Sequence, residues 1–266
     1  CAIWSASTDR MTDFPIRFFI QFFKNHGLLS VKNRPQWRVI KGGSRNYLAP
    51  LIESFKDSIF LNSKVKCLRR RGGLVEIVMD QGQVLEYDQV VMACHSDQAL
   101  ALLDDPTVEE RSALSTIPYQ QNDVVLHTDE SLLPRSRKAW SSWNYLLRQR
   151  YQERAVLSYD MNILQGISSK TTFCVTLNAT DLISPNKVIE KFTYSHPVFS
   201  LDSIRAADRI NQSNGMHNTW FAGAYLGNGF HEDGVKSGLR VAELINLLPN
   251  PENQNSKSNT AVPAYA

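Results

Sequence analysis

The sequence lacks the signatures of several common protein classes. It has four cysteines (Cys1, Cys67, Cys94 and Cys174) and no Cys-x-x-Cys pair, which predicts reduced thiols in a cytoplasmic protein without a disulfide framework. None of its six histidines forms an i, i+4 pair, so no metal site is predicted. No apolar run approaches the ~18 residues of a membrane span, although peripheral contact with a membrane stays open.

The chain also lacks a strong excess of either basic or acidic residues. The 29 basic and 26 acidic residues leave a formal net charge of +3, which argues against a nucleic-acid-binding protein. The chain contains no Gly-x-Ser-x-Gly turn, no Walker phosphate loop and no Gly-x-Gly-x-x-Gly turn. Serine-hydrolase and nucleoside-triphosphatase chemistry are therefore not predicted.

The first residue is Cys1 and not methionine, and no signal peptide precedes the folded pattern. A mature lipoprotein with a lipid-bearing cysteine is one interpretation, and a piece of a longer protein is the other. We expect a piece, because residues 2–4 continue as apolar sequence without a polar tether.

Residues 1–36 are predicted to be helical and rich in aromatic side chains. Ile16, Phe19, Ile20 and Phe23 recur at helical spacing, and Gly27 follows as a left-handed cap. A helix that packs on a core is favoured over one that touches a membrane or lines a lipid site.

Residues 37–115 are predicted to begin with a glycine turn and an amphipathic helix through residues 47–55. A meander of short strands follows from residue 64, with three arginines, 69–71, at a solvated hairpin tip. The apolar run 90–93 predicts a buried strand of a parallel sheet. Thr107 and Glu110 have the spacing of a capping box.

Residues 116–200 are predicted to form an antiparallel sheet that binds a substrate. Its expected strands are residues 124–127, 139–145, 155–159 and 173–177, and the aromatic residues of 139–145 are expected in the core more than in a ligand wall.

Residues 201–248 are predicted to contain a buried strand at 219–223, a glycine-marked loop and a helix. That helix is expected to carry Val235, Leu239, Ala242 and Ile245 on one apolar face. The polar tail 249–266 is predicted to be disordered.

Four segments together carry a resemblance to a known family. They are WRVIKGGSRNYLAPL (37–51), VVMACHSDQALALL (90–103), AWSSWNY (139–145) and TWFAGAYLGNGFHEDGVKSGLRVAELI (219–245). They resemble the flavin-containing amine oxidase superfamily, in its bacterial branch of NAD/FAD-binding oxidoreductases, over nearly the whole chain to about Leu248. The resemblance implies an α/β (α+β) fold, with an incomplete Rossmann-like FAD-binding domain and an inserted antiparallel-sheet substrate domain.

The resemblance also implies roles for individual residues. Val65 matches a position whose backbone touches the adenine, and Gly223 and Ala224 match the loop beside the ribityl-pyrophosphate chain. The positions under the isoalloxazine are Phe230, His231, Asp233, Gly234 and Val235. Asn46 resembles a position near the substrate cavity, so the candidates for a catalytic role are His231, Asn46 and Phe230.

Two departures from the family pattern bear on these roles. Ala224 and Tyr225 stand where many relatives have a glutamate. The Gly-x-Gly-x-x-Gly segment that seats the FAD pyrophosphate is absent, so the chain alone is expected to hold FAD poorly or not at all.

The resemblance implies the later part of an FAD-dependent oxidoreductase. Its expected reaction is the oxidation or desaturation of a small or lipid-like organic substrate, by hydride transfer to the flavin. Two alternatives stay open: a flavin-dependent isomerase without net oxidation, and a binding module that has lost the cofactor.

Overall fold

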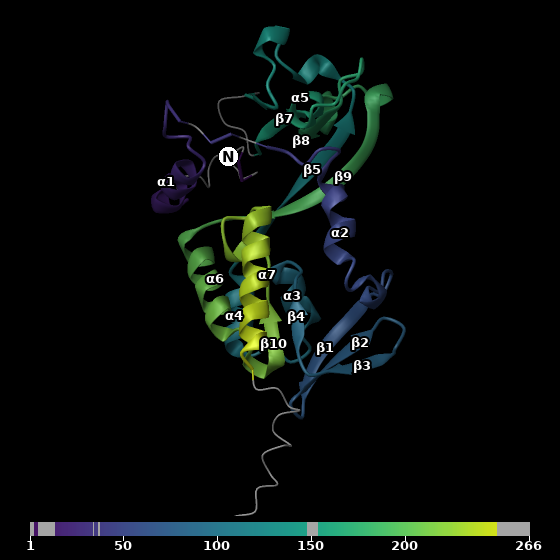
Figure 1. Ribbon diagram of the computed structural model, residues 1–266, viewed down its shortest axis with the longest axis vertical. Coiled ribbons are helices and arrows are strands. Elements are labelled where there is room, and N and C mark those ends of the chain that lie inside the picture. The colour runs from purple at the N-terminus through teal and green to yellow at the C-terminus, as the bar shows by residue number, and fades with distance from the viewer. Residues whose placement is uncertain (1–2, 5–13, 34, 37, 148–153, 249–266) are drawn as a thin grey trace, which may run out of the picture.

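The computed structural model describes residues 3–4, 14–33, 35–36, 38–147 and 154–248. Figure 1 shows three bodies: an antiparallel sheet at one end, a pair of parallel strands among helices, and a small meander beside that pair. The α/β (α+β) class predicted from the sequence is confirmed. The tail expected to be disordered, 249–266, lies outside the described residues.

The antiparallel sheet has five strands. In spatial order they are β6 (Trp143–Leu146), β7 (Val156–Asp160), β8 (Cys174–Leu177), β5 (Tyr119–His127) and β9 (Val188–Pro197). The four predicted strands are confirmed with shifted ends. Strand β9 escapes prediction because Glu190 and Lys191 interrupt its apolar pattern, as a solvent-exposed edge strand permits.

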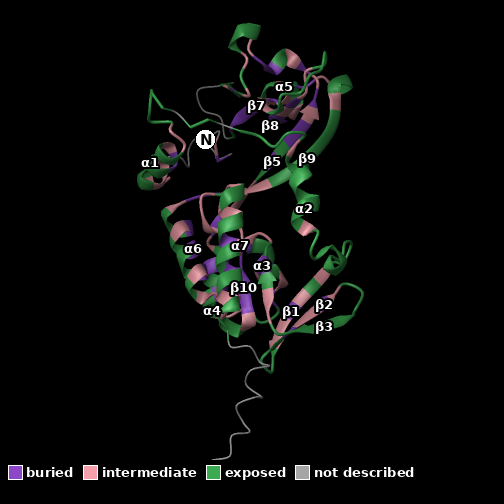
Figure 2. Ribbon diagram, in the orientation of Figure 1, coloured by how far each residue is buried: buried purple, intermediate pink, exposed green. Residues whose placement is uncertain are grey.

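Strand β9 is mostly exposed along its length, whereas β7 is mostly buried (Figure 2). The two faces of the sheet carry different side chains, and both include buried residues. One face is buried and polar: the Thr176 hydroxyl lies 2.7 Å from both His127 Nε2 and Ser158 Oγ. The other face carries exposed aromatic side chains, since residues paired across antiparallel strands share a face. They are Trp143, Tyr145, Phe192 and Tyr194. The prediction that Trp143 and Tyr145 belong to the core is therefore wrong.

The parallel pair consists of β4 (Val90–Met92) and β10 (Thr219–Phe221). Four helices flank it: α3 (Ser96–Leu102), α4 (Val108–Ser115), α6 (Leu201–Ser213) and α7 (His231–Asn246). The predicted parallel strand at 90–93 is confirmed in direction. Val91, however, is 44% exposed, although its partner Trp220 on β10 is buried against α7.

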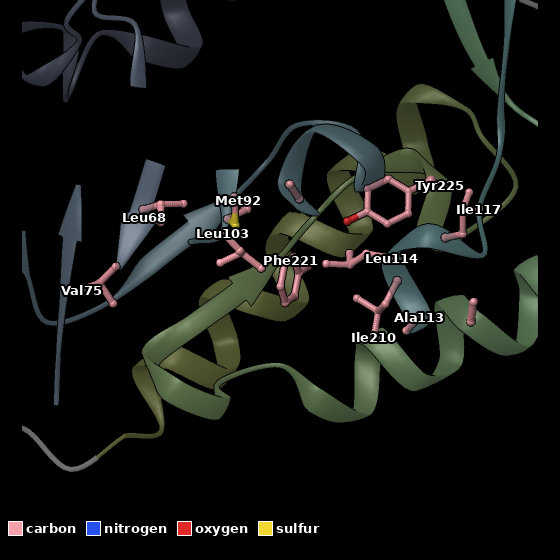
Figure 3. Close-up of a cluster of buried hydrophobic side chains, with 12 residues drawn as sticks. Leu68, Val75, Met92, Leu103, Ala113, Leu114, Ile117, Ile210, Phe221 and Tyr225 are labelled. Carbon is pink, nitrogen blue, oxygen red and sulfur yellow. The ribbon is translucent and has the colours of Figure 1, made fainter. Parts of the chain in front are cut away.

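The main core lies between the parallel pair and the helices α3, α4 and α6 (Figure 3). Phe221, Leu114 and Ile210 are almost completely buried there, and Tyr225 lies at the end of the cluster farthest from Leu68 and Val75. Transfer of each such side chain from water stabilises the fold by about 1.5–3 kcal/mol. The predicted capping box of α4 is confirmed, with Thr107 and Glu110 exchanging hydrogen bonds.

Helix α7 packs differently from the prediction. Its buried residues are Ser237 and Val241, and Ile245 is partly buried. Val235 and Leu239 are more than half exposed, and Ala242 is exposed as well. The face around Val241 turns inward because Trp220 and Ala222 of the parallel pair pack against it.

The meander contains β1 (Val65–Arg71), β2 (Leu74–Met79) and β3 (Val84–Tyr87). The prediction that arginines 69–71 form a solvated tip is wrong for Arg70, whose side chain is only 5% exposed. Its guanidinium donates to both carboxylate oxygens of Glu110, at 2.5 and 2.9 Å, and to Asp105. This pair fastens the meander to α4.

Three further α-helices lie outside the main core. They are α1 (Ile16–Asn25), α2 (Leu48–Ile52) and α5 (Met161–Gln165). The predicted cap at Gly27 is confirmed, with φ at +64°. The amphipathic helix expected over 47–55 is wrong in length, because α2 has five residues, and Leu48 and Leu51 are exposed. No helix in the described part of the chain has the length and apolarity to cross a bilayer.

Candidate functional site

The candidate site lies at the carboxyl ends of the parallel pair. Strands β4 and β10 run in the same direction, so their carboxyl ends meet at one edge. From β4 the chain enters Cys94, His95 and Ser96, and from β10 it enters residues 223–230, which we name the glycine loop. In open α/β sheets, ligands bind beyond this edge.

The glycine loop is held against the first turns of α7. The Gly223 amide donates to Ser237 Oγ at 2.8 Å, and that hydroxyl donates to the Gly234 carbonyl at 2.9 Å. The Asp233 carboxylate accepts from the Phe230 amide at 3.0 Å and from Asn228 Nδ2 at 3.2 Å. Ser237 and Asp233 therefore set the position of the loop.

Close packing explains the glycines. A Cβ on Gly227 would lie 2.6 Å from an Asp233 carboxylate oxygen, and one on Gly223 would lie 2.6 Å from the Tyr225 ring. A Cβ on Gly234 would approach the Ala224 amide nitrogen to 3.9 Å. A side chain is therefore excluded at Gly227 by Asp233 of α7 and at Gly223 by the Tyr225 ring, whereas a Cβ on Gly234 would make an ordinary van der Waals contact.

The start of α7 leaves backbone donors free. Within the described residues, the amides of His231 and Glu232 have no hydrogen-bond acceptor, as expected for the first positions of a helix. These amides lie at the positive end of the helix dipole. The His231 side chain is exposed beside them. The arrangement can bind a group that carries or gains negative charge.

A second group of side chains lies at the same edge. We name it the tyrosine cluster, formed by Cys94, His95, Ser96, Tyr119 and Tyr225. The Ser96 amide donates to Tyr119 Oη at 3.0 Å, and the His95 and Tyr119 rings stack with centroids 4.4 Å apart. Tyr225 Oη is buried and has no hydrogen-bond partner among the described residues. A buried hydroxyl without a partner destabilises the fold, which favours a ligand or water at this position.

Burial favours the uncharged form of three side chains in this cluster. It raises the pKa values of the Cys94 thiol and of the Tyr119 and Tyr225 phenols above their ordinary range. Burial, together with neighbouring His95, lowers the pKa of His196. In the described part of the chain, no three His, Cys, Asp or Glu side chains gather as metal ligands.

The structure brings together most of the residues predicted for the cofactor. Gly223, Ala224, His231, Asp233 and Gly234 lie in or beside the glycine loop, and Val235 is exposed on α7. The role of Asp233 is visible as the cap of the loop.

The other predicted residues lie apart or have packing roles. Phe230 stacks on Phe22 of α1 with centroids 5.1 Å apart, so part of its surface packs in an aromatic cluster. Val65 begins β1 in the meander. Asn46 donates to the Lys41 carbonyl at 2.9 Å and closes its own loop.

Sequence patterns missed Tyr119, His95 and Ser237. Tyr119 begins a strand about 25 residues beyond Cys94, and no spacing rule connects the two. The available signal was the pair of predicted buried strands, whose carboxyl ends share an edge if they are neighbours. That signal points to His95 and Ser96, which follow β4 directly.

The exposed aromatic face of the antiparallel sheet offers a second surface near this edge. Phe192 and Tyr194 stack with centroids 5.7 Å apart and planes 7° from parallel, and they are 41% and 51% exposed. A groove with a volume of about 360 Å³ lies along β5 and β9. Phe192 and Val124 line it, but so do Val125, Lys191 and Thr193, which alternate to the other face of the sheet. His196 lies on the same strand and face as Tyr194, and it is close enough to His95 for the two to interact electrostatically.

Comparisons with known proteins bear on the family and the fold. The family model described as flavin containing amine oxidoreductase matches residues 6–157, more than half of the 266-residue chain. The matched range includes β1 to β6 but ends before the glycine loop. No curated protein sequence matches the chain.

Solved structures share the fold at low sequence identity. Cyclohexylamine oxidase from Brevibacterium oxydans IH-35A has a TM-score of 0.57 and 11% identity, over 88% of this chain and 61% of that one. Putrescine oxidase bound to putrescine has a TM-score of 0.55 and 13% identity, over 77% and 53%. Reduced UDP-galactopyranose mutase has a TM-score of 0.50 and 10% identity, over 71% and 48%. The chain therefore spans about half to three fifths of the length of these proteins.

Proposed function

The chain belongs to the flavin containing amine oxidoreductases, and from that premise we propose that it forms the substrate domain and the carboxyl-terminal flavin-facing segment of an FAD-dependent oxidoreductase. The observation that carries this proposal is the glycine loop with the start of α7, at the carboxyl edge of a parallel pair. Oxidation or desaturation of a small or lipid-like organic molecule is the proposed reaction.

The residues present fit one side of a flavin. The free amides of His231 and Glu232 and the positive end of α7 suit an electron-rich ring edge that gains negative charge on reduction. Gly223 and Gly227 leave room for the Tyr225 ring and the Asp233 carboxylate, which pack closely against the loop backbone. The Cys94 thiol and the Tyr119 and Tyr225 phenols, which burial keeps uncharged, add polar atoms, and Tyr225 Oη has a hydrogen bond to give.

When bound, the flavin would supply the hydride acceptor. The chain's own residues position and protect the reaction. Asp233 and Ser237 hold the glycine loop in place, and the α7 amides stabilise negative charge. His231 is the candidate for proton exchange, because imidazole both donates and accepts protons. Phe230, half-buried against α1, borders this region and excludes water from it.

The substrate surface is proposed to be the aromatic face around Phe192 and Tyr194. Flat apolar side chains bind apolar or aromatic parts of a ligand by stacking and by burial of apolar area. Two of the neighbours named above are putrescine oxidase and cyclohexylamine oxidase. An amine is not implied for this chain, because a shared fold does not fix the substrate.

The pyrophosphate-binding glycine turn is absent from the 266 residues. We therefore expect the chain alone to bind FAD weakly. The test is the visible absorption spectrum of the purified protein, expressed as it stands and together with any coding sequence that precedes it.

Flavin absorption bands in the longer product, bleached anaerobically by substrate, support the oxidoreductase. Flavin bands without net use of an electron acceptor favour the isomerase. A colourless longer product that refuses added FAD contradicts the flavoenzyme and favours the binding module.

A further inference from the structure

The outer face of α1 combines apolar and basic side chains. Phe22 turns inward, where it packs on Trp4 and Phe230 with ring centroids 4.9 and 5.1 Å away. The opposite side of the helix presents the row Ile16, Ile20 and Lys24, one turn apart, with Arg17 beside it. Ile16 is 70% exposed, and its side chain therefore contributes little of the free energy that apolar burial gives.

The same surface continues into the loop after the helix. Leu29 and Val31 are exposed, Val31 to 91%, and Lys32 follows them. Figure 1 shows α1 and this loop at the outer side of the molecule, away from the meander. We name this set of residues the α1 surface: Ile16, Arg17, Ile20, Lys24, Leu29, Val31 and Lys32.

Charge is strongly separated along the chain around this surface. Residues 14–52 contain seven of the 29 basic residues and none of the 26 acidic ones. The remainder of the chain has 22 basic residues against 26 acidic ones and is therefore net negative. A near-neutral total conceals this basic segment, which includes α1 and α2 on different sides of the fold (Figure 1).

We propose that the α1 surface docks on the face of an anionic lipid bilayer. Exposed aliphatic side chains beside lysine and arginine, with no acidic residue among them, are the pattern of an element that lies in a membrane interface. Ile16, Ile20, Leu29 and Val31 enter the headgroup region, and Arg17, Lys24 and Lys32 contact lipid phosphates. The ten-residue helix is about 15 Å long, half the hydrocarbon thickness of ~30 Å, so it lies on the bilayer and does not span it.

Charge complementarity selects this occupant over a second copy of the chain. Two copies meeting through this surface would place two basic segments against each other, and like charges brought together oppose association. A bilayer with anionic headgroups satisfies the charges and the apolar side chains together. This inference does not depend on flavin binding, so it is tested independently of the proposed function.

Vesicle flotation tests the proposal with the whole chain. Vesicles of phosphatidylcholine alone are compared with vesicles that also contain phosphatidylglycerol, at low and high salt. We expect the protein to float with the anionic vesicles only, and added salt to release it. Absence of binding to the anionic vesicles overturns the proposal, as does equal binding to both kinds.

Three variants locate the contact. The triple change Arg17→Gln, Lys24→Gln and Lys32→Gln should weaken binding by about 100-fold, given about 1 kcal/mol for each basic residue near an anionic surface. Changing Ile16, Ile20, Leu29 and Val31 to serine should also abolish flotation. The matched control removes three exposed basic residues elsewhere, Lys66→Gln, Lys170→Gln and Arg240→Gln, and should float like the parent. Equal loss in the control overturns the assignment to α1.

Circular dichroism of each variant verifies that the fold is retained. Sedimentation velocity tests whether a second copy of the chain occupies the α1 surface instead. The proposal is overturned if the protein binds no vesicles and forms a dimer that the serine variant converts to monomer.

Discussion

The antiparallel sheet and the parallel pair satisfy their polar groups and apolar faces in different ways. The sheet's buried face is closed by its own connections: the Asp129 carboxylate accepts from the amides of Ser131 and Ser184 and from Lys187 Nζ. The parallel pair has only two strands, and Val91 stays largely exposed. Parallel strands normally need helices on both faces and further strands beside them. The region that carries the candidate flavin site is therefore the less self-sufficient of the two.

The largest expected effect concerns the pair that fastens the meander beside this region. Arg70→Ala leaves Glu110 buried without its partner, and breaking a buried pair in this way costs about 3–5 kcal/mol of the free energy of unfolding. Urea denaturation measures it. Arg69→Ala is the matched control, because Arg69 is partly exposed in its pair with Asp104 and should change stability little. Equal losses for the two variants would contradict a buried anchor.

The next effect probes the closure of the antiparallel sheet. Asp129→Asn weakens hydrogen bonds to a buried charge and should cost about 3 kcal/mol. Asp123→Asn, at a half-exposed carboxylate, is the control. Burial opposes the charge on Asp129, but the amides of Ser184 and Ser131 and Lys187 outweigh it and lower the pKa well below the ordinary 3.8.

The pH dependence follows from the direction of that shift. The unfolded chain takes up the proton first as pH falls, so the stabilisation is complete above about pH 4 and is lost progressively below it. In the Asp129→Asn variant, the free energy of unfolding should depend less on pH in this window. An unchanged acid limb would argue against Asp129 as its source.

A moderate effect is expected at the glycine loop. Gly227→Val forces a side chain against Asp233 and should destabilise by about 1–3 kcal/mol through overpacking. Gly238→Ala on α7 meets nothing within 4 Å and serves as the control. If FAD binds, fluorescence titration should show weaker binding for the valine variant only. Identical titrations would remove the loop from the flavin site.

The smallest effect compares the titrating histidines. Burial lowers the pKa of His127 from its ordinary 6.5, so the unfolded state binds the proton more readily and stability declines as pH falls below about 6.5. His127→Gln should reduce this slope and cost stability through its bond to Thr176. The measurement is thermal denaturation between pH 5 and pH 7.5. A slope that His127→Gln leaves intact would assign it to His196, whose pKa is also lowered.

Local patterns predicted much of the fold. The capping box at Thr107, the left-handed Gly27 and the parallel strand at Val90 all follow from short-range rules, and each is found. Burial was predicted less well. Arg70 was expected to be exposed and is buried, whereas Val91 was expected to be buried and is partly exposed. Burial is hard to predict because it depends on partners, such as Glu110 for Arg70, that lie far along the chain.

The candidate site divides in the same way. The glycine loop could be predicted, because the strand, its glycines and the following helix are contiguous in sequence. Tyr119 and His95 could not, because their stacking depends on how β5 enters the helical body. Asn46 has a local hydrogen bond that accounts for its position without any ligand.

Strands β5 and β9 also connect the antiparallel sheet to the helices around the parallel pair. Tyr119 pairs with Pro197, and the Val198 amide donates to the Pro118 carbonyl at 2.8 Å, so both crossings pass through proline at one level. Proline restricts rotation about φ, so the backbone has little conformational freedom at both crossings. At about 3.4 Å per residue, the nine-residue β5 extends about 30 Å from this level to His127. The stacking of His95 on Tyr119 therefore ties the candidate site to a strand that pairs with both β8 and β9 of the antiparallel sheet.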